Sequence, residues 1–382
     1  MKHVNMKWVI VYFLTLLLHG CRKNEDKTYS RNIDPPVTAI VPCSGRPIIN
    51  ANLVPVGSIS LERSAIKSAT AGNKILFVGG NNSNPYTYPS LVVDIYDFVA
   101  ATWTTTSLKG NYREGCAITS LGDKIFIAGG SDYMDASRVD IYDASSNSWS
   151  EARLSMPRTG LAAGSAGNKV VFAGGETYDD IFPWDQAVDI YDIQTDRWTT
   201  ARLSVGRSQI SATTVDNKIY FAGGQTDLSL FDNIDIYDAS TNSWDTSHLA
   251  ARKGRVSSIA AGNSIYWAGG LWFATNAAMV ACNKVEIKDL NTGHTSLECN
   301  LPSYDFSSVK NNDNIVFFTG NMLDDGHTYF EIFNTGTQQW STGKLNYKIT
   351  GASVICANNT IYVAGGNDGA GTHYKQVWNL EF

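Results

Sequence analysis

The sequence predicts an all-β fold in which one four-stranded unit occurs seven times. Three markers recur: a glycine pair that ends a short apolar run, an acidic residue followed nine positions later by tryptophan, and a basic residue 17 positions before the second glycine. The period is 45 to 50 residues and contains no helical segment. Four short strands per period are typical of a β-propeller. We therefore expect seven blades, with six as the alternative if the fifth or sixth copy is degenerate.

The glycine pair marks the end of the second strand of each unit, strand b. The run before it alternates with a period of two and follows a turn such as "AGNK", "LGDK" or "VDNK". Asn and Gly in these turns supply the positive backbone angles that a tight hairpin needs. The pairs are Gly79-Gly80, Gly129-Gly130, Gly174-Gly175, Gly223-Gly224, Gly269-Gly270 and Gly365-Gly366, with Thr319-Gly320 in the same place.

The other two markers locate the remaining strands. The acid lies on strand c and the tryptophan opens strand d, in Asp94/Trp103, Asp140/Trp149, Asp189/Trp198, Asp235/Trp244 and Glu331/Trp340, whereas Glu286/Thr295 lacks the tryptophan. The basic residue precedes strand a in five copies, as Arg63, Arg113, Arg158, Arg207 and Lys253, and the last two copies have Ser303 and Ile349. The seventh unit lacks a strand d, so we expect the N-terminal "NLVPVGSISLERS" to supply it and to remove an open sheet edge.

The glycine pair, the downstream aromatic residue and the basic residue together resemble the kelch repeat, over about residues 50 to 382. The regular tryptophans (Trp103, Trp149, Trp198, Trp244 and Trp340) are expected to pack the blades. The spacing between acid and tryptophan never changes, whereas the spacing from the second glycine to the acid runs from 10 to 16 residues. Length variation is thus concentrated in the b–c connections, and long loops on a rigid scaffold are where binding residues gather.

The b–c loops and the starts of the strands a lie at the same end of an up-and-down blade. We predict a ligand site at this end, formed by Arg63, Arg113, Arg158, Arg207 and Lys253 together with the loop residues Tyr133, Tyr178, Trp184 and Trp272. Other loop aromatics are Tyr86, Tyr88, Phe182, Phe231, Phe273, Tyr329 and Tyr374. Aromatic platforms beside Asp and Asn suit a glycan, and Arg suits its carboxylate or sulfate, so an anionic sugar is the favoured ligand and a protein partner the other. The alternative for the basic residues is structural, with each guanidinium paired to carbonyls or carboxylates of a neighbouring blade.

An enzyme is the competing hypothesis, because galactose oxidase and the bacterial sialic-acid mutarotases resemble this kelch arrangement. A mutarotase or epimerase needs general acid–base groups, for which Glu114 and Glu176 are the candidates; their other interpretation is as solvated loop residues. A copper oxidase would use histidines such as His327 and His373, yet the Tyr-His dipeptide of galactose oxidase is missing. We expect no cofactor and no metal.

The N-terminus predicts export. Residues 1–20 have the layout of a lipoprotein signal peptide, with Cys21 as the lipidated residue, and residues 21–49 are expected to be a flexible tether before the propeller at 50–382. This places the protein on the bacterial outer membrane or cell surface by a lipid anchor, or otherwise in the periplasm or medium. In such an oxidising compartment Cys282 and Cys299, which flank one predicted hairpin, could form a disulfide. The formal charge of −6 argues against nucleic acid as a partner.

Overall fold

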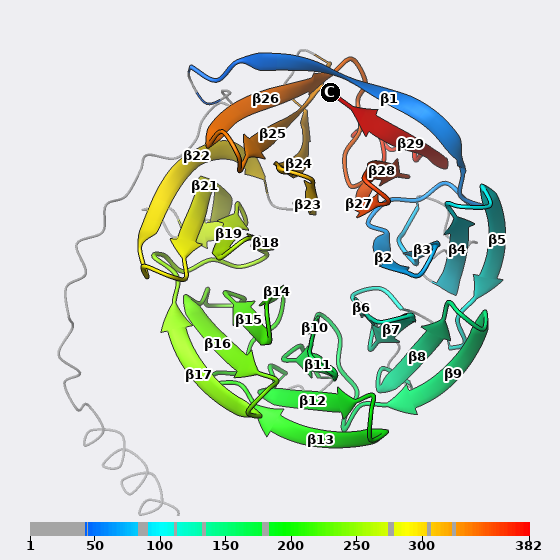
Figure 1. The fold of residues 1–382 in the computed structure, drawn as a ribbon, viewed down its shortest axis with the longest axis vertical. Coiled ribbons are helices and arrows are strands. Elements are labelled where there is room, and N and C mark those ends of the chain that lie inside the picture. The colour runs from blue at the N-terminus through cyan, green and yellow to red at the C-terminus, as the bar shows by residue number, and fades with distance from the viewer. Residues whose placement is uncertain are drawn as a thin grey trace, which may run out of the picture. The chain divides into compact units, whose positions relative to one another are not determined.

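The computed structural model describes Cys43 and residues 45–82, 91–110, 113–131, 135–177, 183–273, 279–303, 307–322 and 326–382. The predicted signal peptide and Cys21 therefore lie outside the described residues. Residues Pro36–Phe382 belong to one compact unit, whose described part is a ring of seven blades (Figure 1). No helix in the described ranges is long and apolar enough to cross a membrane.

Each blade is an antiparallel sheet, and in blades 1 to 4 and 6 the strands follow chain order outward from the centre of the ring. Blade 1 consists of β2 (Lys67–Ala71), β3 (Lys74–Val78), β4 (Val92–Asp97) and β5 (Thr102–Ser107), and blade 2 of β6 (Ala117–Leu121), β7 (Lys124–Ala128), β8 (Arg138–Asp143) and β9 (Ser148–Arg153). Blade 3 consists of β10 (Ala162–Ala166), β11 (Lys169–Ala173), β12 (Ala187–Asp192) and β13 (Arg197–Arg202), and blade 4 of β14 (Ser211–Val215), β15 (Lys218–Ala222), β16 (Asn233–Asp238) and β17 (Ser243–His248). Blade 5 consists of β18 (Ser257–Ala261), β19 (Ser264–Ala268), β21 (Met279–Asp289) and β22 (Thr295–Ser303), with β20 (Leu271–Phe273) added beside β21. Blade 6 consists of β23 (Ser307–Asn311), β24 (Asn314–Met322), β25 (Thr328–Asn334) and β26 (Gln339–Leu345), and blade 7 of β27 (Ser353–Ala357), β28 (Thr360–Ala364) and β29 (Gln376–Glu381).

The N-terminal strand β1 (Ile48–Ser58) completes blade 7, as predicted. Its second half pairs antiparallel with β29, from Asn52 opposite Glu381 to Ser58 opposite Gln376. Its first half pairs in parallel with β26 of blade 6, Ile48 lying opposite Thr342 and Ala51 opposite Leu345. Because β1 contacts both blades, blades 6 and 7 form one continuous eight-stranded sheet across the joint of the ring.

Burial falls from the second strand of each blade to the outermost one. In blade 2, Ile125 to Ala128 of β7 are fully buried, because this strand is covered by both neighbouring blades, whereas β9 is almost wholly exposed. The tryptophan that opens strand d packs on an aromatic residue of strand c, with ring centroids 4.5 Å apart for Tyr96 and Trp103 and 4.8 Å apart for Phe333 and Trp340. The regular tryptophans therefore pack within the blades, as expected.

The disulfide prediction is wrong. Cys299 is bonded to Cys43, with 5.9 Å between their Cα atoms, whereas Cys282 is a fully buried free thiol. A register irregularity in β21 places Lys284, not Cys282, opposite Cys299, and Cys282 lies opposite Ser303. The segment at Cys43 is thus fastened to the propeller, although it falls within the range 21–49 that we expected to be a tether.

Candidate functional site

The five repeated basic side chains are buried between strands and neutralised by the acids of the second marker. Their exposed fractions are 0 to 2%. The pairs are Arg63–Asp94 at 2.7 Å, Arg113–Asp140 at 3.0 Å, Arg158–Asp189, Arg207–Asp235 at 2.8 Å and Lys253–Glu286 at 3.4 Å. Each pair joins the residue before strand a to strand c of the same blade. Burial lowers the pKa values of Arg63, Arg158 and Arg207, an effect that the paired carboxylates oppose.

These pairs also fasten each blade to the next. The acid accepts the backbone N–H of the incoming connection, as Asp189 does from Ser155 at 2.8 Å and Asp235 from Ser204 at 2.8 Å. The carbonyl of the basic residue accepts the N–H of the second glycine of the preceding blade, for example Gly175 N–H to Arg207 at 3.0 Å. Gly175 has φ +107, and a Cβ there would lie 2.7 Å from the carbonyl oxygen of Thr159, so only glycine fits.

The predicted ligand role of these five cations is therefore wrong, because a ligand has no access to their side chains. A ligand cannot contact side chains that are at most 2% exposed and already ion-paired. The structural alternative is the one that the geometry supports, although the partner carboxylate lies in the same blade instead of a neighbouring one. In blade 7 the two positions of the ion pair carry no charge. Ile349 occupies the position of the cation, and Trp378 occupies the position on strand c that the acid has in the other blades. Both residues belong to one apolar cluster.

The predicted loop residues have mixed outcomes. Tyr133 and Tyr178 lie outside the described residues. Trp184 is half-buried and forms a β-bridge with Glu176, and Trp272 is half-buried on β20 opposite Val280. Both tryptophans therefore lie in the b–c connections, where they were expected.

The candidate catalytic residues belong to blades 2 and 3, and the candidate metal-binding residues to blades 6 and 7. Glu114 is exposed, while Glu176 accepts a hydrogen bond from the Ser208 hydroxyl. His327 lies beside Tyr329 in blade 6, with ring centroids 6.3 Å apart, and His373 lies in blade 7. Across the described ranges, no group of three or more His, Cys, Asp or Glu is placed to hold a metal ion.

A hollow of about 660 Å³ lies at the junction of blades 7 and 1. It is formed by the connection from β1 to β2, the start of the blade 1 b–c loop, and the end of the blade 7 b–c loop. The lining residues are Glu62, Asn82, Gly371, Thr372, His373, Tyr374, Lys375 and Gln376. Asn82 donates a hydrogen bond to the carbonyl of Glu62 at 3.2 Å, which joins the start of the blade 1 b–c loop to the connection between β1 and β2. The hollow is a shallow depression that is open to solvent.

Hydrogen bonds hold the blade 7 side of this hollow in one conformation. Asp368 accepts the N–H groups of Ala370 and Thr372 at 2.8 and 2.9 Å, and these bonds lower its pKa. Tyr374 N–H binds the carbonyl of Gly366 at 2.8 Å, and its carbonyl accepts Arg63 N–H at 3.1 Å. The b–c loop of blade 7 is thus fixed at both ends before any ligand arrives.

Tyr374, which lines the hollow, belongs to an aromatic cluster whose other two members lie beyond the lining residues. Tyr347 lies 5.3 Å from Tyr374 between ring centroids, and both rings contact Trp378. Tyr347 is 37% exposed, whereas Trp378 is buried. Burial, the neighbouring Tyr347 and Asp368 raise the pKa of Tyr374 to about 12, so its phenol stays protonated, and it donates to the carbonyl of Lys348 at 3.1 Å.

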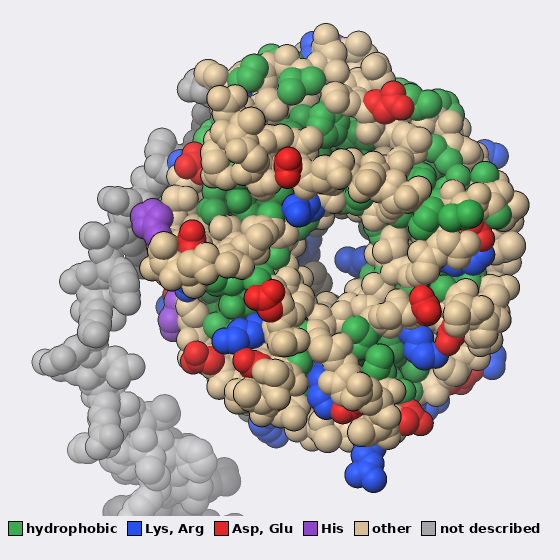
Figure 2. Space-filling view, in the orientation of Figure 1, with side chains coloured by type: hydrophobic (Ala, Val, Ile, Leu, Met, Phe, Trp, Pro, Cys, Tyr) green, Lys and Arg blue, Asp and Glu red, His purple; other side chains and the backbone are tan. Residues whose placement is uncertain are grey.

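The channel wall carries cations that sequence reasoning missed. The seven inner strands consist mostly of small, hydroxyl-bearing and aliphatic residues, and their only charged members are Lys67 and Lys310, both exposed. Figure 2 shows the open centre of the ring with Lys or Arg side chains on its wall. The signal was available in the sequence, since other blades have Ala, Ser, Thr or Cys at these two repeat positions.

Comparison with known proteins supports the architecture. The kelch motif model matches residues 112–153 and 206–246, which fall on blades 2 and 4. A solved structure titled "Structure of YjhT" superposes with a TM-score of 0.53 at 13% identity, covering 84% of this chain and 95% of that chain. No curated protein sequence matches the chain. At this identity the structural likeness shows the fold alone.

Proposed function

The chain is a kelch-repeat β-propeller, a fold that serves for binding or for catalysis, and from that premise we propose that it is a binding protein that recognises a glycan. The observation that carries this proposal is the hollow between blades 7 and 1, with the aromatic cluster of Tyr374 at its edge. The regular repeat residues are buried in ring-forming contacts. The hollow, in contrast, is lined by residues that the repeat does not explain.

The chemistry of the hollow suits a sugar ring. A pyranose presents a flat apolar face and a set of hydroxyl groups, and the exposed ring of Tyr347 matches the face. Glu62, Asn82 and Gln376 offer carboxylate and amide groups that pair with hydroxyls. Because the loop is fixed in advance, binding costs little ordering of the protein.

The residues that could recognise a charged ligand differ from those predicted from the sequence. The buried arginines are unavailable to an anion, and the hollow contains Lys375 and His373 on one side and Glu62 on the other. We propose Lys375 as the contact that would recognise a carboxylate or sulfate. A neutral sugar would not depend on it.

We further propose that the protein works at the bacterial envelope, anchored through Cys21. The sequence pattern of residues 1–21 supports this location. An anchored propeller with a fixed ligand site would hold a glycan at the cell surface.

Titration of the full-length protein in detergent with neutral, uronic-acid and sialic-acid oligosaccharides tests the proposal. We expect Tyr347→Ala to weaken binding about tenfold, the effect of losing roughly 1.4 kcal/mol of stacking. Trp149→Ala is the matched control, because Trp149 is equally exposed, at 37%, but lies on β9 of blade 2. Lys375→Gln should weaken binding only of acidic sugars. The proposal fails if Tyr347→Ala binds as the wild type does, or if both aromatic variants lose binding equally.

A further inference from the structure

Blade 6 keeps the buried acid of the repeat but lacks its cation. Glu331 on β25 is fully buried, and the position that precedes strand a in this blade is Ser303. Burial is the main cause that raises the pKa of Glu331. A buried carboxylate without a partner is strongly destabilising, so the charge of this acid has to be balanced from elsewhere.

Arg46, from the N-terminal segment, supplies the missing charge. Its Nη1 lies 2.7 Å from Oε2 of Glu331, and its side chain is 9% exposed. Its Nη2 donates to the carbonyl of Cys299 at 2.5 Å, and the guanidinium lies 4.2 Å from the centre of the Trp340 ring. Arg46 therefore pairs with the buried acid of blade 6 from outside that blade, whereas Arg63 pairs with the buried acid of blade 1 from within its own blade.

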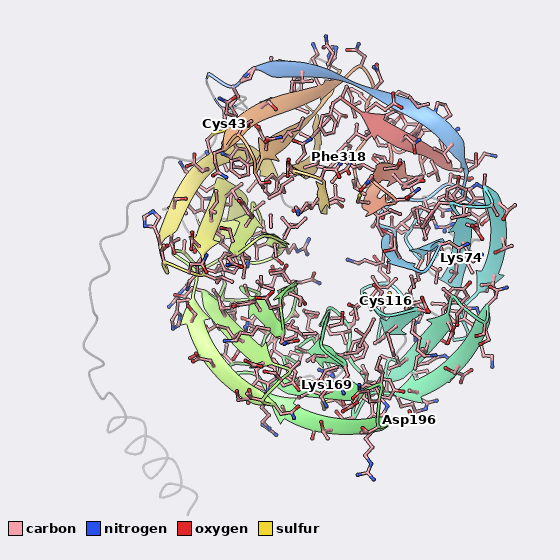
Figure 3. All side chains as sticks on the ribbon, in the orientation of Figure 1. Cys43, Lys74, Cys116, Lys169, Asp196 and Phe318 are labelled. Carbon is pink, nitrogen blue, oxygen red and sulfur yellow. A yellow bond between two sulfur atoms is a disulfide. The ribbon has the colours of Figure 1, made fainter. Side chains whose placement is uncertain are left out.

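Two attachments hold Arg46 in place. On one side, Cys43 is disulfide-bonded to Cys299 across a sequence separation of 256 residues. On the other side, Thr342 N–H binds the carbonyl of Pro47 at 2.9 Å, and Ile48–Ala51 pairs with β26. Figure 3 shows Cys43 at the outer side of blade 6, close to β26.

We propose that Cys43, Arg46 and Ile48–Ala51 form a redox-sensitive clasp across blades 5 and 6, in which the disulfide to Cys299 on β22 of blade 5 keeps Arg46 paired with Glu331 of blade 6. A dithiol reductant opens the clasp: its two thiols become a disulfide, and the bond between Cys43 and Cys299 is replaced by two thiols. Release of Cys43 frees the chain on one side of Arg46. Glu331 then loses its counter-charge for part of the time, and β25 and β26 loosen while the other blades stay closed.

Hydrogen–deuterium exchange of the full-length protein with and without dithiothreitol tests the clasp. We expect reduction to speed exchange at least several-fold in β25, β26 and the first half of β1, and to leave β10–β17 of blades 3 and 4 unchanged. The double variant Cys43→Ser/Cys299→Ser should behave like the reduced wild type and show no further response to reductant. Cys356→Ser, which removes a half-buried thiol of blade 7, is the control and should respond as the wild type does.

The charge contribution is tested separately in the oxidised protein. Arg46→Met should lower the thermal midpoint and speed exchange in β25, because Glu331 is left unpaired. Adding Glu331→Gln to that variant should recover much of the loss, since the amide carries no charge and can still contact the Thr342 hydroxyl, which lies 3.2 Å from the Glu331 carboxylate. The proposal is overturned if peptide mapping finds Cys299 bonded to Cys282. It is equally overturned if reduction changes exchange in all blades alike or in none, or if Glu331→Gln gives no recovery.

Discussion

The buried ion pair of blade 4 offers the sharpest test of how the ring is held together. Arg207 donates to Asp235 at 2.8 Å, to the Gly223 carbonyl at 2.6 Å and to the Phe221 carbonyl at 3.2 Å. Its side chain is fully buried, and that of Asp235 is 4% exposed. Replacement of Arg207 by Met therefore removes the counter-charge of a buried carboxylate, which keeps only its hydrogen bonds from Ser204. It also removes the guanidinium as a donor to four backbone carbonyl groups.

Breaking a buried pair in this way costs about 3–5 kcal/mol. The unfolding entropy of roughly 2.1 cal/mol/K per residue gives about 0.7 kcal/mol/K for a domain of about 330 residues, so a loss of about 4 kcal/mol lowers the melting midpoint by about 6 °C. Asp235→Leu should have a similar effect, because it leaves the guanidinium unpaired. The double variant Arg207→Met/Asp235→Leu should be more stable than the sum of the two losses by about 3 kcal/mol.

Chemical and thermal unfolding followed by circular dichroism provide the four stabilities of this cycle. Blade 7 gives the reason to expect recovery in the double variant, since Ile349 and Trp378 fill the same two positions without charge. Additive losses of stability in the double variant would refute the argument that each cation neutralises the buried acid of its own blade. Single variants as stable as the wild type would refute the claim that the pairs hold the ring.

Two further predictions concern acid stability and the anchor. Lys169 and the backbone N–H groups of Gln194 and Thr195 hold the pKa of Asp192 at about 2. Because this folded-state pKa lies below the ordinary value of about 3.9, the contribution of Asp192 is present above about pH 4 and is lost as the pH falls through 2. We expect Asp192→Asn to show a shallower loss of stability over this range than the wild type, and parallel curves would contradict this. Metabolic labelling of cells with an alkyne fatty acid should label the wild-type protein and not Cys21→Ser; equal labelling of both would exclude Cys21 as the lipidated residue.

The ring and its closure could be predicted from the sequence because each blade repeats the same local pattern. The Gly-Gly pairs, the acid–tryptophan spacing and the missing last strand locate the strands without knowledge of long-range contacts. The burial of Arg158 and its equivalents was harder to predict, because the sequence does not show that strands a and c present these side chains to each other across strand b. Both the basic and the acidic marker were visible in the sequence, but their ion pairing depends on how the strands are arranged in space.

The disulfide and the hollow could not be predicted for a related reason. Cys43 reaches Cys299 only after the ring has brought the N-terminal segment past blade 6. Similarly, Glu62 and Lys375 border one hollow only because β1 joins β29 and places blade 7 beside blade 1. Pairings within one blade follow from short-range spacing, whereas contacts at the joint of the ring depend on closure.

The N-terminal segment therefore connects the clasp to the proposed ligand site. Arg46 pairs with blade 6, β1 completes blade 7, and Glu62 beyond β1 lines the hollow. Tyr347 of the aromatic cluster follows the end of β26 by two residues, and β26 is the strand to which the clasp is attached. A ligand that binds only when β1 and β26 are both in place must, by linkage, stabilise the closed clasp by the same free energy that the clasp contributes to binding. If both proposals hold, the position of Arg46 outside its blade would make ring closure and ligand recognition thermodynamically dependent on each other.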